Sequence, residues 1–390
     1  MNRFNSEPSH TVGYVSVACQ GPHDRRSRNE SLAKGDRQDT IAIGLIRFRR
    51  TASVPMGPSV KDVAALAQVS VGTVSNVLNR PEQVTPEKRK RVQAAIAQLG
   101  FVRNESARSL RSGSSRSLGM LVLDVRNPFF TDVALGAEDV AEEHKHSFIL
   151  ANSSEDARRE QAYLDLFEEQ RVQGILITPV GDVLQRLEAM QSRGIPSVLV
   201  DRLAGSENFC SVSVDDVAGG RAAIEHLIAG GAERPAFVGG PFTLQQVADR
   251  HAGALAAAAA AGVQLQVFET PNLKFERGRH VGDLIGDLRQ SRRPDAVFAA
   301  NDQLALGLLQ SFTANGIRVP DDVALVGFDD IDFATQSSIP LSSIGQPRQL
   351  IGERAARLLF DEIENPHGHE HQQIVFTPEL VVRESSRRPG

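Results

Sequence analysis

Apolar residues recur at helical spacing in three short stretches of the first third of the chain. The expected helices, each with its capping residue, are 60–67 after Ser59, 71–78 after Ser70, and 86–99 after Thr85. Gly100 follows the last helix and is expected to end it. The positions expected to face inward are Val63, Leu66, Val69, Val74, Val77, Leu78, Val92, Ile96 and Leu99. The pattern therefore predicts a small three-helix module.

After residue 116 the pattern changes to apolar runs of strand length that alternate with helical stretches. The expected strands are 119–125, 147–152, 174–179 and 196–201, followed by 211–214, 236–239, 264–268, 296–299 and 323–327. This βαβ rhythm occurs twice, which predicts an α/β body of two successive lobes, each built on a doubly wound parallel sheet. Ligands bind beyond the carboxyl ends of such strands. Polar and aromatic residues gather there, namely Asp124, Asn127, Phe129, Phe130, Asp201, Arg202, Asn301, Asp302, Asp329 and Asp330.

These patterns divide the chain into an extension, a head, a connector and a body. The expected segments are a disordered extension at 1–57, a head at 58–103, a hinge helix and linker at 104–117, and a two-lobed domain at 118–386. The first lobe is expected at about 118–201 and 331–360, and the second at about 202–330 and 361–386. Met56 lies just before the first organised segment, which suggests the hypothesis that translation starts there.

The formal net charge of −5 conceals a strong asymmetry along the chain. Residues 1–57 carry a net +4, residues 58–117 a net +6, and residues 118–390 a net −15. A basic head can neutralise DNA phosphates, whereas an acidic body would be repelled by them. Charge alone leaves open that the basic stretch is an ordinary solvated surface.

Several protein classes lack support in the sequence. No apolar run has the length of a membrane span, and the polar N-terminal residues do not form a signal-peptide pattern, so we expect a cytoplasmic protein. The two cysteines, Cys19 and Cys210, are far apart and have no CxxC spacing or histidine-rich company, which predicts neither a disulfide nor a zinc site. No phosphate loop or dinucleotide fingerprint occurs either, so we expect no cofactor and no enzymatic activity.

The first two helices, separated by residues 67–70, have the spacing of a helix-turn-helix, whose second helix lies in the major groove. On that helix an amide such as Asn76 can pair with adenine, and Val71 can contact a thymine methyl group. The candidate DNA contacts are Ser70, Val71, Gly72, Thr73, Ser75, Asn76 and Asn79. Helix pattern alone leaves open a three-helix module with another role.

The run from Val60 to Asn79 closely resembles the head of the lactose/galactose repressor family. The resemblance continues through residues 84–89, 99–101 and 104–110, and extends over residues 59–386. It implies a transcription regulator, in the first place a repressor, with a periplasmic-binding-protein-like body. It also implies a cytoplasmic homodimer that binds a near-palindromic double-stranded operator. Many relatives carry arginine at the position of Asn76, so the base preference there is expected to differ.

The same resemblance assigns a role to residues 104–111. A helix this short is marginal alone, so it should fold on contact with DNA. In the family this hinge helix enters the minor groove, where the residue matching Leu110 wedges between base steps. The contacts implied here are Asn104, Ala107, Arg108 and Leu110. The alternative is a plain interdomain linker.

The resemblance further implies an effector pocket between the lobes. The matching residues, with the two phenylalanines of the strand-end pattern, are Phe129, Phe130, Arg250, Asn301, Asp329 and Gln346. Such groups suit the hydroxyls of a sugar or a related metabolite. Leu273 stands where many sugar-binding relatives have an aromatic ring, so an effector other than a sugar stays open. The rival interpretations are an enzyme, an exported sugar-binding protein, and an activating or effector-independent regulator.

Overall fold

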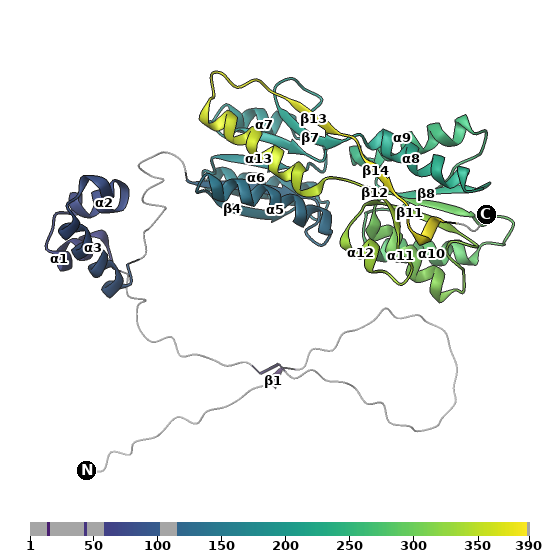
Figure 1. Cartoon of the computed structure of the whole chain (residues 1–390), viewed down its shortest axis with the longest axis horizontal. Coiled ribbons are helices and arrows are strands. Elements are labelled where there is room, and N and C mark those ends of the chain that lie inside the picture. The colour runs from purple at the N-terminus through teal and green to yellow at the C-terminus, as the bar shows by residue number, and fades with distance from the viewer. Residues whose placement is uncertain (1–13, 16–42, 45–57, 102–114, 388–390) are drawn as a thin grey trace, which may run out of the picture. The chain divides into compact units, whose positions relative to one another are not determined.

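The computed structural model describes residues 14–15, 43–44, 58–101 and 115–387 and divides into two compact units, residues 1–103 and 104–390 (Figure 1). In the first unit, β1 (Tyr14–Val15) pairs antiparallel with β2 (Ile43–Gly44). Tyr14, Val15 and Ile43 are aromatic or β-branched residues, which favour strands. The expected disorder of residues 1–57 and the start at Met56 fall almost entirely outside the described residues and stay predictions.

The head consists of α1 (Val60–Ala67), α2 (Val71–Asn79), the 3-10 turn η1 (Pro81–Gln83) and α3 (Pro86–Leu99). Each α-helix begins where the sequence predicts. The Ser70 hydroxyl caps α2 by accepting a hydrogen bond from the Thr73 N–H at 3.1 Å. Thr85 precedes α3, yet its side chain makes no capping hydrogen bond, and Pro86 at the first helical position sets the backbone instead.

The core of the head is made of small apolar side chains, in part different from those expected. Its buried members are Val63, Ala64, Ala67, Val74, Val77, Val84, Val92 and Ala95. Leu66 was expected inside but is 42% exposed. The inward face of α1 is set by Val63, Ala64 and Ala67, and Leu66 falls on its flank. The predicted helical period of α1 is therefore correct, but the predicted centre of its buried face is wrong.

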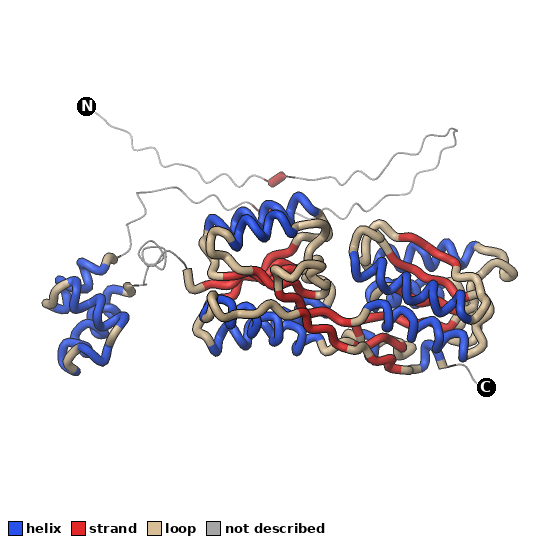
Figure 2. The backbone as a smooth tube through the Cα atoms, turned by 90° about the horizontal axis from the view of Figure 1, so that it is seen from above, coloured by secondary structure: helices blue, strands red, loops and turns tan. Residues whose placement is uncertain are grey.

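The first lobe of the body is built on a sheet of order β13-β7-β6-β5-β3-β4 in which every strand pair is parallel. Its strands are β3 (Ser117–Val122), β4 (Ser147–Asn152), β5 (Gly174–Ile177), β6 (Ser197–Val200), β7 (Cys210–Val214) and β13 (Gln373–Phe376). Its helices are α5 (Pro128–Glu143), α6 (Ala157–Glu169), α7 (Leu184–Gln191) and α13 (Arg348–Glu364). Figure 2 shows helices on both faces of this sheet.

The second lobe has a sheet of order β14-β12-β11-β10-β8-β9, parallel except where β14 pairs antiparallel with β12. Its strands are β8 (Pro235–Gly239), β9 (Gln266–Glu269), β10 (Ala296–Ala299), β11 (Ala324–Asp329), β12 (Ser342–Gly345) and β14 (Glu379–Val381). Its helices are α8 (Asp216–Ala229), α9 (Gln245–Ala260), α10 (Phe275–Asp287), α11 (Asp302–Ala314) and α12 (Asp332–Gln336), and the 3-10 turn η2 (Glu384–Ser386) follows β14. None of the described helices is both long and apolar enough to cross a membrane.

Strand pairing corrects the expected lobe boundaries. Strand β7 pairs with β6 and β13 in the first lobe, although residues 202–214 and 361–376 were assigned to the second. Strand β12 pairs with β11 in the second lobe, although residues 331–345 were assigned to the first. The chain therefore crosses between lobes after β7, after β12 and after β13. Short parallel strands have similar apolar patterns, so their sequence does not reveal which sheet they join.

A close helix contact positions the polar groups of the second lobe. Helices α8 and α9 touch at two glycines, where a Cβ on Gly220 would lie 2.0 Å from the Arg250 carbonyl oxygen and one on Gly253 would lie 1.9 Å from that of Val217. Any side chain at either position would push the helices apart. The two glycines therefore bring the Arg250 side chain on α9 within reach of the beginning of α8.

Candidate functional site

The exposed face of α2 is the predicted DNA-reading surface. Val71 is 46% exposed, and Gly72, Asn76 and Asn79 are also exposed, while Val74 and Val77 on the opposite side are buried. Ser70, Thr73 and Ser75 lie beside this face, and the hydroxyls of Ser70 and Thr73 are 2.9 Å apart. The helix therefore presents amide, hydroxyl and methyl groups together, which are the groups that read base edges and phosphates.

Some polar groups near this face also make hydrogen bonds within the head. The Asn79 amide donates a hydrogen bond to the Ser75 carbonyl oxygen at 2.9 Å. Arg91 on α3 donates to the carbonyl oxygens of Ala67 and Gln68 at 2.5 and 2.8 Å, which holds the turn between α1 and α2. Gln68 in that turn has a φ of 51°. Arg91 thus orients α2, a positioning role that the sequence analysis did not assign.

The predicted hinge contacts Asn104, Ala107, Arg108 and Leu110 lie outside the described residues. Their roles stay predictions.

The polar strand ends of the body converge on a buried group that we call the interlobe cluster. Its members are Asn127, Asp201, Asp216, Gln246, Arg250, Asp329 and Gln346, all buried. At its centre the Arg250 Nε lies 2.7 Å from Asp216 Oδ1, and Arg250 Nη1 lies 3.8 Å from Asp329 Oδ1. The guanidinium carbon of Arg250 also lies 3.6 Å from the centroid of the Phe328 ring. A single cation is therefore held by two carboxylates and an aromatic face.

Two hydrogen bonds of the cluster join the lobes. The Asn127 amide of the first lobe donates to Asp329 Oδ2 of the second at 3.1 Å, and the Gln246 amide of the second donates to Asp201 Oδ2 of the first at 3.1 Å. The Gln346 amide, in the crossing after β12, donates to Asp329 Oδ1 at 2.8 Å. Asp329 thus receives amides from both the first lobe and a crossing segment, which couples its position to the angle between the lobes.

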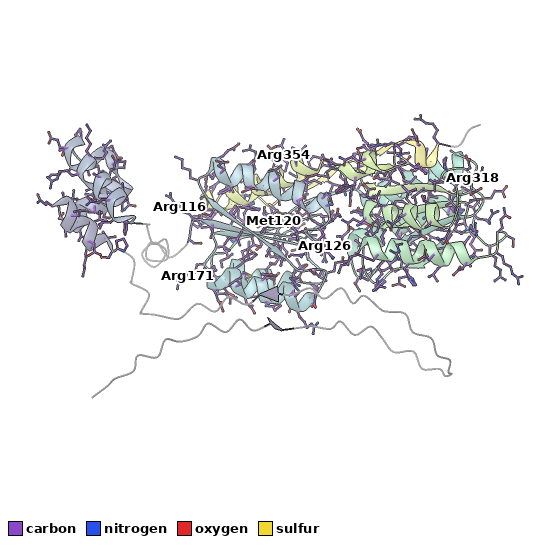
Figure 3. All side chains as sticks on the ribbon, turned by 90° about the horizontal axis from the view of Figure 1, so that it is seen from below. Arg116, Met120, Arg126, Arg171, Arg318 and Arg354 are labelled. Atoms are coloured by element: carbon purple, nitrogen blue, oxygen red, sulfur yellow. The ribbon has the colours of Figure 1, made fainter. Side chains whose placement is uncertain are left out.

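Two further contacts bridge the lobes beside the cluster. The Gln303 amide on α11 donates to the Arg126 carbonyl oxygen at 2.7 Å. Arg126 lies at the end of the first lobe that faces the second, whereas Arg116 and Arg171 lie at its far end (Figure 3). Burial raises the pKa of Glu155 to about 7, although the Lys274 ammonium and the Leu273 N–H of the second lobe favour its ionised form.

Burial dominates the electrostatics of the interlobe cluster. Loss of hydration raises the pKa of Asp201 well above its ordinary value, raises that of Asp216 to about 6, and raises that of Asp329, while the positive charge of Arg250 opposes each shift. Three carboxyl groups share one guanidinium in this buried space. Burial therefore favours the neutral forms of these carboxyl groups, and added negative charge would be unfavourable there.

Three acceptor atoms in the cluster have no hydrogen-bond partner among the described residues. They are Asp201 Oδ1, Gln246 Oε1 and Gln346 Oε1. A buried polar atom without a partner costs about 1–3 kcal/mol, so each of these oxygens is a place where a donor from a bound molecule would be stabilised. The cluster lacks donors rather than acceptors.

The residues predicted for an effector site fall into two groups. Arg250, Asp329 and Gln346 meet in the interlobe cluster. Phe129 and Phe130 instead belong to the hydrophobic core, 1% and 5% exposed, with their rings in edge-to-face contact at 4.9 Å. That arrangement gives no support to the expectation that they form an aromatic face for a ligand.

Asn301 has a local structural role in the described chain. Its side-chain oxygen caps α11 by accepting a hydrogen bond from the Leu304 N–H at 2.9 Å, and its amide donates to the Leu273 carbonyl oxygen at 3.2 Å. Its contact with an effector stays a prediction.

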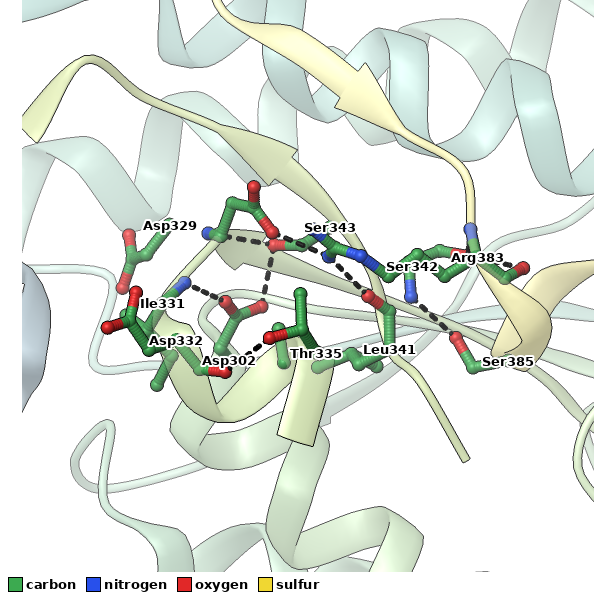
Figure 4. Close-up of polar contacts among 12 residues, drawn as sticks. Asp302, Asp329, Ile331, Asp332, Thr335, Leu341, Ser342, Ser343, Arg383 and Ser385 are labelled. Carbon is green, nitrogen blue, oxygen red and sulfur yellow. Dashed lines mark hydrogen bonds and ion pairs between the residues drawn. The ribbon is translucent and has the colours of Figure 1, made fainter. Parts of the chain in front are cut away.

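A second polar layer fixes the turn that follows β11 (Figure 4). The Asp302 carboxylate accepts hydrogen bonds from the Ser343 hydroxyl at 2.7 Å and from the Ile331 N–H at 2.9 Å. The Ser343 hydroxyl in turn accepts from the Asp330 N–H at 3.0 Å. Asp329 has a φ of 105°, a backbone conformation that is rare for residues other than glycine. The hydrogen bonds of Asp302 and Ser343 stabilise the turn that contains it.

Two cavities are lined in part by members of the interlobe cluster. One of about 210 Å³ is lined by Asp216 and Gln246 together with Arg202 and Val214 of the first lobe. Another, of about 570 Å³, is lined by Gln346 and the beginning of α13. The largest of the three, about 670 Å³, lies among α10, α11 and α12 and is lined by no predicted site residue.

Two members of the interlobe cluster, Asp216 and Gln246 at the beginnings of α8 and α9, were not among the predicted site residues. A signal for Asp216 exists, since the Asp215-Asp216 pair comes directly after β7 as the other strand-end acids do. The expectation that Cys210 has no histidine company is wrong. His369 Nε2 and His371 Nδ1 lie 3.2 and 3.7 Å from the Cys210 sulfur.

A helix-turn-helix head followed by a two-lobed body with a buried polar cluster between the lobes defines a ligand-sensing DNA-binding regulator. The profile of bacterial regulatory proteins of the lacI family matches residues 59–104, and that of the periplasmic binding protein-like domain matches residues 224–386. The HTH-type transcriptional repressor PurR of Vibrio campbellii is 32% identical over 85% of this chain and 99% of its own length. The Ribose operon repressor of Bacillus subtilis is 36% identical over 77% of this chain and 90% of its own length.

Solved structures agree with these relatives. The transcriptional regulator CelR–cellobiose complex is 31% identical with a TM-score of 0.61 and covers 84% of this chain and 99% of its own. The lac repressor dimer bound to operator and the anti-inducer ONPF, 24% identical with a TM-score of 0.73 over 85% of this chain and 100% of its own, shares the fold. The chain belongs to the lacI family of bacterial regulatory proteins. The predicted family, fold class and function as a transcription regulator are confirmed, and its relatives are transcriptional repressors rather than enzymes.

Proposed function

We propose that this chain represses transcription as a cytoplasmic homodimer on a near-palindromic double-stranded operator, and that a small neutral, hydroxyl-rich molecule bound between the lobes changes its operator affinity. The observation that carries the sensing half is the interlobe cluster, in which an excess of buried carboxyl groups coincides with three acceptor atoms that have no partner among the described residues. The proposed division is a head at 58–103, a hinge at 104–117, and an effector-binding and dimerisation domain from 118 to 386.

The DNA half of the proposal rests on α2. We assign base and phosphate contacts to Ser70, Val71, Gly72, Thr73, Ser75, Asn76 and Asn79, and minor-groove contacts to Asn104, Ala107, Arg108 and Leu110. One head of this size reads few base pairs, so useful specificity requires two heads on two half-sites. A symmetric dimer meets that need and makes the operator near-palindromic.

The chemistry of the cluster selects the class of effector. An anion would add charge to a buried group whose carboxyls already exceed its one cation, and this is unfavourable. A neutral polyol brings hydroxyl donors to the unpartnered oxygens and lone pairs to Arg250 and the amides. Relatives support this class, because the CelR structure contains cellobiose and a LacI-family regulator from Enterococcus faecium, 27% identical, contains ribose.

The coupling mechanism is a shift between two arrangements of the lobes. Two hydrogen bonds join the lobes in the arrangement described, one from Asn127 to Asp329 and one from Gln246 to Asp201. A ligand that donates to the unpartnered oxygens of the cluster binds this closed arrangement better than an open one. By linkage, the same differential affinity alters the spacing of two heads and hence operator affinity. The sign of the response distinguishes an inducer from a co-repressor.

The test is calorimetric titration of the full chain with ribose and with cellobiose, alongside operator binding. Gln346→Met removes the side-chain amide at similar volume and should weaken binding of whichever sugar binds by about 10- to 100-fold. The matched control is Gln161→Met, an exposed amide on α6 outside all three cavities, which should bind as the parent does. Equal affinity in parent and Gln346→Met would remove the cluster from the ligand site.

A further inference from the structure

A cysteine and two histidines meet in the first lobe, at the end of the sheet where β7 and β13 begin. Cys210 is the first residue of β7, and His369 and His371 lie in the segment that leads into β13. The two segments are joined by a hydrogen bond from the Ser211 N–H to the Gln372 carbonyl oxygen at 2.9 Å. Sheet pairing therefore holds the three side chains together, even though about 160 residues of chain separate them.

The three ligand atoms have the spacing of a tetrahedral metal site. Zn–S bonds of about 2.3 Å and Zn–N bonds of about 2.0–2.1 Å place sulfur and nitrogen about 3.5 Å apart around a tetrahedral ion. The Cys210 sulfur lies 3.2 Å from His369 Nε2 and 3.7 Å from His371 Nδ1, on either side of that value. All three atoms lie within 4.8 Å of one another.

A fourth ligand is available from the last turn of α13. Glu362 is 8% exposed, and its Oε1 accepts a hydrogen bond from the Gln191 amide at 3.1 Å. Its Oε2 is buried without a hydrogen-bond partner among the described residues and lies 4.0 Å from His369 Nε2. A buried carboxylate oxygen without a hydrogen-bond partner, close to a ligating histidine, is an independent indication of a cation there.

The neighbours of the cluster orient its atoms for metal binding. His369 Nδ1 lies 2.6 Å from Asp361 Oδ2, so the ring proton belongs on Nδ1 and the lone pair of Nε2 points toward Cys210. A carboxylate behind a ligating histidine is the usual outer support of a metal site. The Gln372 N–H also donates to the Cys210 sulfur at 3.2 Å, which holds that atom beside the histidine segment.

We propose that Cys210, His369, His371 and Glu362 bind a divalent transition-metal ion of the zinc class. Four protein ligands leave no open position, and Cys210 and the His369 side chain are 0% and 2% exposed, which is the character of a structural rather than a catalytic site. The ion would tie the end of α13 to β7 and β13. This inference is independent of DNA reading and of the effector.

The test uses the full chain, stripped of metal with a chelator under reducing conditions and then titrated with Co²⁺. We expect one ion per chain, with the thiolate charge-transfer band and the visible bands of tetrahedral cobalt, and displacement of both by Zn²⁺. Zn²⁺ should also raise the melting temperature of the stripped protein. Octahedral cobalt without a thiolate band, or no bound ion, would overturn the proposal and leave a thiol–imidazole hydrogen bond as the role of Cys210.

Matched variants separate this site from adventitious binding. Cys210→Ser and His371→Ala should each lose the thiolate band or weaken Co²⁺ binding at least tenfold, and should lose the zinc-dependent rise in melting temperature. The controls are His367→Ala, an exposed histidine of the same segment outside the cluster, and Cys19→Ser, the other cysteine; both should behave as the parent does. If Cys210→Ser fails to fold, the half-buried His371 variant still decides, and parental binding by it would contradict the assignment.

Discussion

The reading face of the head and the interlobe cluster of the body are both polar, but the polar groups of the first are exposed to water and those of the second are buried. On α2, Asn76 and Val71 are exposed in a segment with net positive charge. In the cluster, Arg250 and Asp329 are 3% and 2% exposed in an acidic body, and Arg250 pairs with Asp216 at 2.7 Å and with Asp329 at 3.8 Å. Free energy of DNA binding therefore comes from groups already in water, whereas ligand binding depends on groups that folding has already dehydrated.

That contrast predicts different responses to perturbation. Side chains on the exposed face can be exchanged with little effect on folding, because water replaces the partner that is lost. Removing a charged member of the buried cluster leaves its partners without compensation. Four experiments test this difference between the exposed face of α2 and the buried interlobe cluster.

The largest effect should be that of salt on operator binding. With on the order of 6–10 phosphate contacts per dimer, affinity should fall roughly 10³–10⁵-fold between about 50 and 200 mM salt. Fluorescence anisotropy with a labelled operator measures this slope, and sugar affinity over the same range is the internal control, because a buried cluster is weakly screened. A flat slope for the operator would mean that the basic head is only a solvated surface.

Arg250→Ala should strongly destabilise the body. It leaves Asp216 and Asp329 buried without their cation, at a cost of about 3–5 kcal/mol in the free energy of unfolding. Part of this loss should be recovered as pH falls, because the orphaned carboxyls then protonate. Chemical denaturation measures it, with Arg318→Ala as control, an exposed arginine at the outer end of the second lobe (Figure 3) that should unfold as the parent does. Equal free energies of unfolding for the two variants would show that the charge of Arg250 does not stabilise the buried carboxyl groups.

Asn76→Ala should act on sequence preference and leave folding intact. The loss should be about 1–3 kcal/mol at one base pair of each half-site, with binding to random DNA nearly unchanged. Leu110→Ala should instead reduce DNA bending together with specific affinity, because a wedge permits contacts that only kinked DNA makes. Gln93→Ala on the exposed side of α3 is the control in binding and bending assays. If neither variant separated operator from random DNA, the reading surface would be wrongly assigned.

The smallest effect should be a pH dependence at the lobe boundary. Burial raises the pKa of Glu155 to about 7, so the folded state holds this proton more tightly than the unfolded chain does. Its contribution to stability is therefore full below about pH 4.5 and is lost as pH rises through about 7, by on the order of 1–2 kcal/mol for this partly exposed group. Glu155→Gln should remove that part of the stability profile, measured by denaturation from pH 5 to 8. If the stability of Glu155→Gln depended on pH as that of the parent does, a group other than Glu155 would titrate in this range.

The parts of the structure that could be predicted from sequence are those encoded locally. Ser70 before α2 and Gly100 after α3 mark helix ends through their own backbone and side-chain chemistry, and α1 and α3 have the expected bounds. Leu66 shows the limit, because helical period alone does not fix the centre of the buried face. The family resemblance supplied Arg250, Asp329 and Gln346, which the structure brings together.

What could not be predicted depends on contacts between distant segments. Strands β7, β12 and β13 join sheets that their apolar patterns do not specify. Asp216 meets Arg250 because Gly220 and Gly253 allow α8 and α9 to touch. The histidines of residues 367–371 formed a visible pattern, but their meeting with Cys210 follows from the pairing of β13 with β7.

Operator affinity should be measured with and without saturating sugar, in the parent chain and in Gln346→Met, using whichever of ribose and cellobiose binds the parent. This measurement tests the claim that the DNA-reading face and the sugar site are separate sites, coupled by the equilibrium between arrangements of the lobes. We predict that the sugar changes the operator affinity of the parent by about 5- to 150-fold, the usual range of such coupling. Without sugar, Gln346→Met should bind the operator within a few-fold of the parent, and at the sugar concentration that saturates the parent it should show little response. An equal response in both proteins, or a loss of operator binding by Gln346→Met without sugar, would contradict the claim.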